Sequence, residues 1–389
     1  MALLKKTYPL SPVIKLLPLL LMGLLVLGGC QSTGFMLQAI QGQWEILQKK
    51  RPIEEVVQED ATPANLRERL EYVMQVREFA ATSLHLPVEE AYSEYADLER
   101  PYVVWNVFAA PEFSMRSKTW CYPIAGCVAY QGYFAERPAH EAAEALTSEA
   151  FDTHVGGVPA YSTLGWFDDP VLNTFIWYDP VDLAGLLFHE LAHRRLYIKG
   201  DTAFNESWAT AIEQEGVQRY IQYTSNTPSQ NAPPLLSIYS ADAINARYAE
   251  RAQSREQFVA LVKQTIGELE ALYKESLSQE DKRARKTEII EVLRARYTKL
   301  AQQRKISSGY ERWFNAPINN AKLLTVANYH QWTPGLRYKI RELGDLNAFY
   351  QWSESLADLS KEERMEVLIK LNELAQHSAA SSFESETSK

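Results

Sequence analysis

Two histidines four residues apart, His189 and His193, constrain this chain more than any other feature of its sequence. They lie in the run from Asp182 to Tyr197, which has apolar residues on nearly every side and therefore predicts a buried helix. Positions four apart project from one face of a helix, one turn above each other, so two imidazole nitrogens can meet one ion. Glu190 lies beside them, where it can reach a water molecule at that ion without being a ligand.

A third ligand is expected further along the chain. Buried histidines and carboxylates need partners, and a zinc ion would satisfy them together. Zinc hydrolases of this type use three protein ligands. Gly200 breaks the first helix, a second begins near residues 201–202, and Glu206 lies in its first turn, 13 positions after His193. A short turn lets the two helices face each other, so the sequence predicts Zn²⁺ held by His189, His193 and Glu206. Thr210 either holds a histidine or packs between helices.

The motif continues into a longer pattern. The segment F-H-E-L-A-H-R-x-L-Y-x-K-G-D-T-A-F-N-E-S-W-A-T resembles the glutamate-zincin metallopeptidases, and specifically the bacterial predicted-aminopeptidase family of envelope proteins. The resemblance extends to YSTLGWFDDP before the motif and to residues 121–134, and it covers most of the chain after residue 29. It implies a zincin-like catalytic core, zinc on His189, His193 and Glu206, and Glu190 as the general base of an aminopeptidase.

Several parts of such a site stay open. Tyr161, Tyr178 and Tyr197 are candidates for the oxyanion donor, although each can equally be structural. Trp166 and Phe167 belong to a possible edge strand that would bind an extended peptide substrate. Cleavage at the N-terminus and cleavage within a chain both remain open. The alternative function is a non-catalytic envelope lipoprotein, a scaffold or chaperone with a structural metal or none.

The N-terminus predicts export. Three lysines precede or border the uncharged stretch 16–27, which is too short to span a bilayer as a helix but suits a signal peptide. The sequence Leu27-Gly-Gly-Cys30 resembles a bacterial lipobox, so residues 1–29 are expected to be removed and Cys30 to carry lipid. Gln31 favours the outer membrane, with the protein facing the periplasm. An uncleaved membrane anchor is the alternative.

Two further cysteines, Cys121 and Cys127, lie close together in the chain. In an oxidising compartment an even count at short spacing favours one disulfide, with Pro123 and Gly126 supplying the turn. Two buried free thiols are the alternative.

The rest of the chain predicts an α+β fold that is predominantly α-helical, with a small β region and long C-terminal helices. Helices are expected over 35–50, 65–82 and 139–151, strands within 102–133 and over 160–167, and helices almost throughout from Pro180. Apolar spacing over 258–272 and 289–300 predicts a helical hairpin, with Ser278 and Asp281 forming a capping box between its arms.

Domain organisation and partners follow from composition. We expect a signal peptide at 1–29, one metallopeptidase domain at 30–376 and a disordered Ser-rich tail at 377–389. The net charge of −9, without a long basic run, argues against nucleic acid as a partner. The expected partners are a peptide substrate and the membrane, which the protein would contact through its lipid anchor alone.

Overall fold

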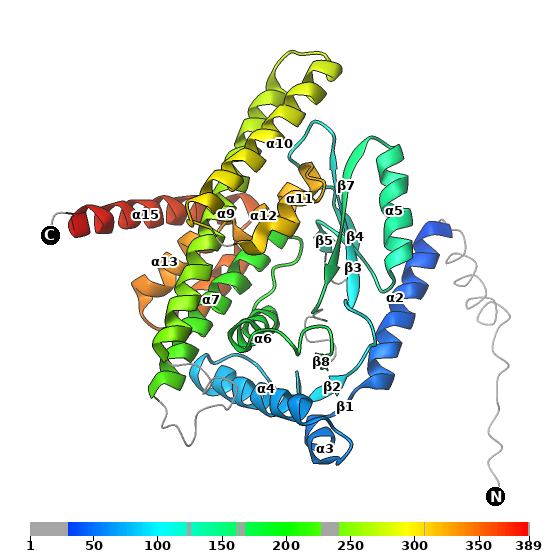
Figure 1. Ribbon diagram of the computed structural model, residues 1–389, viewed down its shortest axis with the longest axis vertical. Coiled ribbons are helices and arrows are strands. Elements are labelled where there is room, and N and C mark those ends of the chain that lie inside the picture. The colour runs from blue at the N-terminus through cyan, green and yellow to red at the C-terminus, as the bar shows by residue number, and fades with distance from the viewer. Residues whose placement is uncertain are drawn as a thin grey trace, which may run out of the picture. The chain divides into compact units, whose positions relative to one another are not determined.

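The computed structural model describes residues 30–122, 126–160, 163, 168–226, 241–306 and 308–387. These residues are mostly helical and include three small sheets, which confirms the predicted α+β, predominantly α-helical class (Figure 1). The chain divides into one compact unit up to Gln48 and another from Lys49 onward. In the part that the structure describes, no helix is both long enough and apolar enough to cross a membrane.

The first unit contributes helix α2, Cys30–Lys49. The predicted helix over 35–50 is therefore confirmed, and it extends back to Cys30. The predicted signal peptide at 1–29 lies outside the described residues.

The second unit begins with strand β1 (Arg51–Pro52), helices α3 (Ile53–Gln58) and α4 (Ala64–Ser83), and strand β2 (Glu94–Ala96). The helix predicted over 65–82 is α4. Strand β2 pairs with β1 in an antiparallel manner and with β8 (Val171–Leu172) in a parallel one. This small sheet joins the start of the unit to the segment that leads into the histidine helix.

A second sheet has strand β3 (Val104–Pro111) at its centre, between β6 (Gln131–Tyr133) and β7 (Phe151–Val158), all antiparallel. Trp105 and Val107 of β3 pack on Ala139 and Ala143 of helix α5 (Glu136–Ser148). Strands β4 (Trp120–Tyr122) and β5 (Gly126–Val128) form a separate hairpin. The strands expected within 102–133 are thus present.

Of two sequence expectations near this sheet, one needs correction and the other falls mostly outside the described residues. The helix predicted over 139–151 ends at Ser148, because Phe151 opens β7, which pairs with all eight residues of β3. Two glycines and largely half-exposed side chains leave β7 without a strong strand pattern. The strand predicted over 160–167 falls mostly outside the described residues, including Trp166 and Phe167.

From residue 180 onward the described chain is helical. Helices α6 (Pro180–Arg195) and α7 (Thr202–Asn226) form one pair, and α9 (Ala241–Lys274) and α10 (Gln279–Gln302) form the long hairpin seen in Figure 1. Among the apolar positions that predicted the hairpin, Leu269 and Leu293 are fully buried, whereas Ile266, Ile289 and Leu300 are partly buried against the same core. Ser278 caps α10 by accepting from the Asp281 N–H at 3.1 Å, which confirms one half of the predicted capping box. The Asp281 carboxylate accepts from the Ser278 hydroxyl at 2.7 Å and not from the Ser278 backbone N–H of a standard capping box.

Shorter helices complete the unit: η1 (Ser308–Tyr310), α11 (Glu311–Asn315), α12 (Asn320–His330), α13 (Thr333–Leu343), α14 (Leu346–Ser355), η2 (Leu356–Asp358) and α15 (Lys361–Thr387). Helix α15 extends to Thr387 and so includes most of 377–389, the segment expected from the sequence to be a disordered tail. Alanine and glutamate among the serines are compatible with continuation of a helix that Leu368 and Leu371 anchor by burial.

Candidate metal centre

Helix α6 begins at a strong start signal. The Asp179 carboxylate accepts a hydrogen bond from the Val181 N–H at 3.2 Å, and Pro180 occupies the first helical position. Most of its apolar side chains, among them Leu183, Leu187 and Leu191, are buried, and Leu186 is half-buried, close to what the all-round apolar pattern predicts. The helix is therefore held rigidly along its length, and its last two turns carry the histidines.

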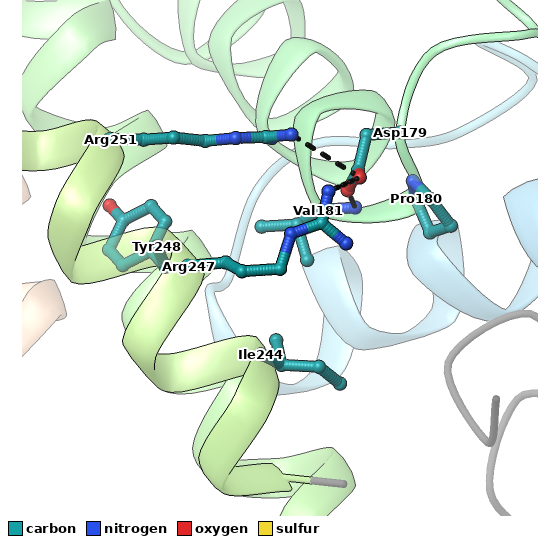
Figure 2. Close-up of a pocket in the computed structure, with 7 residues that line it drawn as sticks. All are labelled: Asp179, Pro180, Val181, Ile244, Arg247, Tyr248 and Arg251. Atoms are coloured by element: carbon teal, nitrogen blue, oxygen red, sulfur yellow. Dashed lines mark hydrogen bonds and ion pairs between the residues drawn. The ribbon is translucent and has the colours of Figure 1, made fainter. Parts of the chain in front are cut away.

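Helix α9 is attached to the N-terminal end of α6 by ion pairs. Figure 2 shows Arg247 and Arg251 of α9 reaching the Asp179 carboxylate, at 3.2 and 3.4 Å, and Arg251 also contacts Asp182 at 2.7 Å. A small cavity lies between these residues. It is not part of the metal centre, because about 14 Å of helix separates Pro180 from His189.

The turn between α6 and α7 is fixed by side chains of the N-E-S-W segment and its neighbours. Asn205, 1% exposed, accepts from the Ile198 N–H and donates to the Ile198 carbonyl, both at 2.8 Å. Asp201 accepts from the Phe204 N–H at 3.3 Å, which caps α7. Gly200 has φ +81°, a value that favours glycine. These contacts place the first turn of α7 beside the end of α6.

Three predicted ligands converge at this point. Ligand atoms of His189, His193 and Glu206 all lie within 4.8 Å of one another, and all three residues are buried. Glu206 Oε2 is 3.4 Å from His189 Nε2 and 3.6 Å from His193 Nε2. Two imidazole nitrogens and a carboxylate oxygen are the donors that zinc prefers. The sequence prediction of a His-His-Glu group is thus matched by geometry that could hold a metal ion.

The electrostatics of this group suit a cation. Burial raises the pKa of Glu206, but His193 and His189 outweigh it and hold the pKa at about 2. Burial lowers the pKa of His189, yet hydrogen bonds with Glu206 and Glu213 dominate, so that pKa lies well above its usual range. The Glu206 carboxylate is ionised beside both imidazoles, and a dication would take the place of the extra proton that His189 otherwise holds.

Glu190 lies next to the group formed by His189, His193 and Glu206 without being part of it. Its pKa is raised by burial, against the opposing charges of His189 and His193. Asp169 and Tyr92 are near enough for the Glu190 charge to affect their own pKa values, and the Tyr92 N–H donates to the Asp169 carbonyl at 2.7 Å. The end of the YSTLGWFDDP segment is therefore next to Glu190.

Glu213 is a site residue that the sequence analysis missed. Its Oε2 lies 3.1 Å from His189 Nδ1, on the side of the ring away from Glu206. This is the position in which a carboxylate orients a metal-binding histidine. Thr210, considered for that role, is buried and makes no hydrogen bond to His189. The spacing 206, 210, 213 along one helix face is the signal that could have indicated Glu213.

The three tyrosines considered as oxyanion donors differ in their position relative to the His-His-Glu group. The Tyr197 ring lies 6.4 Å from that of His193, and its pKa is raised by burial and by Glu206, so Tyr197 belongs to the site. Tyr178 is 38% exposed and immediately precedes the residue that caps the far end of α6. Tyr161 lies outside the described residues.

His330 also approaches the centre. Burial lowers its pKa to about 4, and charges on Glu213 and His189 are close enough to contribute. The turn after α12 is held on α7, because Ser207 Oγ accepts from the Trp332 N–H at 3.1 Å. The residue after Glu206 thus fixes the end of α12 beside the histidines.

The Cys121–Cys127 pair lies near the same turn. The two residues are opposite each other in the β4–β5 hairpin and form a disulfide. Gly126, with φ +76°, is so close to the α6–α7 turn that a Cβ atom there would be 2.8 Å from the Gly200 nitrogen. The hairpin therefore packs on the connection between the two helices that carry the ligands.

Fold and site together define a helix-rich α+β protein with a buried His-His-Glu centre and an adjacent glutamate. A family model described as "Putative aminopeptidase" matches residues 34–368, and the chain belongs to this family. The comparisons with curated proteins and with solved structures found no match. Family membership supports a peptidase function.

Proposed function

We propose that this protein is a zinc-dependent peptide hydrolase, an aminopeptidase, anchored by lipid in the bacterial envelope and facing the periplasm. The observation that carries the metal-dependent part is the convergence of His189, His193 and Glu206, with ligand atoms within 4.8 Å, in a buried site beside Glu190. The family assignment supports the peptidase part. Cys30 is the proposed lipid attachment site, and Gln31 favours the outer membrane.

In this proposal, His189, His193 and Glu206 hold the ion. Zinc supplies polarisation of the scissile carbonyl and acidification of water at neutral pH. Glu190 takes a proton from the water as the water oxygen bonds to the carbonyl carbon, and the carbonyl oxygen becomes an oxyanion. Glu190 then gives that proton to the leaving nitrogen as the carbon–nitrogen bond breaks and the carbonyl reforms. Tyr197, beside His193, is the proposed hydrogen-bond donor to the developing oxyanion.

The deciding experiment compares zinc-loaded wild type with Glu190→Gln. Because Glu190 is not a ligand here, the variant should keep its zinc while losing about 10²- to 10⁴-fold in rate. Peptides are supplied with free and with acetylated N-termini. Cleavage of the free set alone identifies an aminopeptidase, and cleavage of both identifies an endopeptidase. Equal rates for wild type and variant would exclude Glu190 as the base, and no cleavage at all would favour the non-catalytic scaffold.

Metal binding and anchoring are tested separately. Elemental analysis should find one zinc in the wild type and loss of metal in His189→Ala and Glu206→Ala, and full occupancy in both variants would contradict the proposed ligands. Mass spectrometry should find lipid on Cys30, and Cys30→Ser should be unprocessed or released from membranes. A wild-type protein free in the periplasm without lipid would contradict the anchor.

A further inference from the structure

Helix α2 has two apolar faces that differ in the exposure of their side chains. The less exposed face contains Phe35, Ala39, Gly42 and Ile46, which are buried or half-buried. The other face carries four large apolar side chains that are more than half exposed: Met36 (53%), Leu37 (55%), Ile40 (61%) and Trp44 (60%). At 100° per residue these four positions form one stripe along the helix. We call it the α2 stripe.

The α2 stripe lacks the charges expected of a surface helix in water. No charged residue occurs from Phe35 to Trp44, and the exposed polar neighbours are glutamines, Gln41 and Gln48. The two charged residues of α2, Glu45 and Lys49, are half-buried and lie off the stripe. A solvent-facing side of a helix normally carries charged residues, so this one is suited to an apolar or interfacial environment.

We propose that the α2 stripe inserts into the surface of the lipid bilayer. The choice of a bilayer rests on the proposed lipid attachment, since α2 begins at Cys30, the residue that would carry the acyl chains. Trp44 is about 21 Å from Cys30 along the helix, so the whole stripe lies within reach of the membrane that holds the anchor. Tryptophan is favoured at the level of lipid headgroups, and an amphipathic helix adds a second contact to a covalent lipid.

The test places a fluorescent label on each face of α2 in the mature lipoprotein, processed from the full chain. Ile40→Cys labels the stripe and Ala39→Cys labels the less exposed face. The added thiol is the reactive one, because the Cys30 sulfur carries lipid and Cys121 and Cys127 form a disulfide. The proteins are reconstituted into vesicles of phosphatidylethanolamine and phosphatidylglycerol. An NBD label at position 40 should shift its emission to the blue and be quenched by brominated acyl chains, whereas the label at position 39 should not be quenched.

Native tryptophan gives a second readout that needs no label. Brominated lipid should quench part of the wild-type tryptophan emission, and Trp44→Phe should remove that part. Lipidated protein in which neither position 40 nor Trp44 is quenched would overturn the membrane-bound stripe while leaving the anchor intact. Disulfide-linked dimers of Ile40→Cys without quenching would overturn it in favour of a second copy. The mass of the Cys30 peptide from the same sample reports on the anchor alone.

Discussion

Glu213 Oε2 lies 3.1 Å from Nδ1 of His189, and this contact decides which nitrogen of the ring faces the metal centre. In the zinc-bound form that we propose, the Glu213 carboxylate would accept the Nδ1 proton, and Nε2, which lies 3.4 Å from Glu206 Oε2, would be the nitrogen left to bind the ion. Glu213 thereby fixes both the tautomer and the orientation of the first histidine of the motif.

Glu213→Gln should weaken zinc binding by about 10- to 100-fold, because the neutral amide no longer favours a proton on His189 Nδ1. Affinity is measured by competition with a chelator of known strength. Glu215→Gln is the matched control on the same helix, since the Glu215 carboxylate pairs with Arg219 at 2.8 Å and does not contact the histidines. Unchanged affinity in Glu213→Gln would remove Glu213 from the site.

The pair formed by Arg364 and Asp201 should dominate the stability of the α7 start. Arg364 Nε donates to Asp201 Oδ2 at 2.9 Å, and the side chains are only 4% and 8% exposed. Arg364→Ala leaves the Asp201 carboxylate buried without its partner, so the free energy of unfolding should fall by about 3–5 kcal/mol. Urea unfolding measures the change.

A surface pair provides the comparison for Arg364. Arg283 is 53% exposed and contacts Glu112 at 2.6 Å. Arg283→Ala should lower the free energy of unfolding far less than Arg364→Ala does, because solvent screens an exposed ion pair. Equal losses in the two variants would mean that burial does not set the strength of the Arg364 pair.

Gly126→Ala tests the contact between the disulfide hairpin and the ligand-bearing helices. Its φ of +76° disfavours alanine, and the new Cβ would lie 2.8 Å from the Gly200 nitrogen. The backbone strain alone should cost about 1–3 kcal/mol, and displacement of the α6–α7 turn should also lower zinc affinity. Gly267→Ala is the control, because a Cβ there meets nothing within 4 Å in the middle of α9. Wild-type stability and zinc affinity in Gly126→Ala would show that the contact is unimportant.

Local sequence patterns predicted the three residues at the core of the candidate site. His189 and His193 are four residues apart on one helix, so their convergence follows from helix geometry alone. Glu206 follows after a turn short enough to limit where α7 can begin. Glu213 and His330 were missed for different reasons. Predicting the contact of Glu213 requires knowing which face of α7 is turned toward α6, and the sequence does not give this. His330 reaches the site because the Trp332 N–H binds Ser207, which is more than a hundred residues away along the chain.

In the fold, too, elements set by local sequence patterns were predicted, and an element set by pairing with a distant segment was not. The helices α4, α9 and α10 have an apolar period that continues along the chain. The bounds of α4 were predicted to within one residue, and the spacing over 258–272 and 289–300 located the two arms of the hairpin within α9 and α10. Strand β7 carries Gly156 and Gly157 and has little pattern of its own, since it is defined by pairing with β3. The end of α5 was therefore placed at Phe151 instead of Ser148.

His154 should make folding sensitive to mild acid. It lies opposite Phe108 in the β3–β7 pair, with ring centroids 6.2 Å apart, and burial followed by the positive charge of Lys322 lowers its pKa to about 4. In the unfolded chain the pKa of this group is about 6.5. Between about pH 6.5 and pH 4, the unfolded chain therefore binds a proton at His154 that the folded chain does not bind. Stability is thus fully present above that window and falls as the pH drops through it, by at most about 1.4 kcal/mol per pH unit.

His154→Phe keeps an aromatic ring against Phe108 and removes the titration. Urea unfolding of wild type and variant from pH 7 to pH 4.5 measures the difference, in which contributions from the metal centre and from other titrating groups cancel. The variant should lose less stability than the wild type on acidification, and the gap should open below about pH 6.5. Parallel curves for the two proteins across this range would mean that His154 takes up its proton in the folded state as readily as in the unfolded chain.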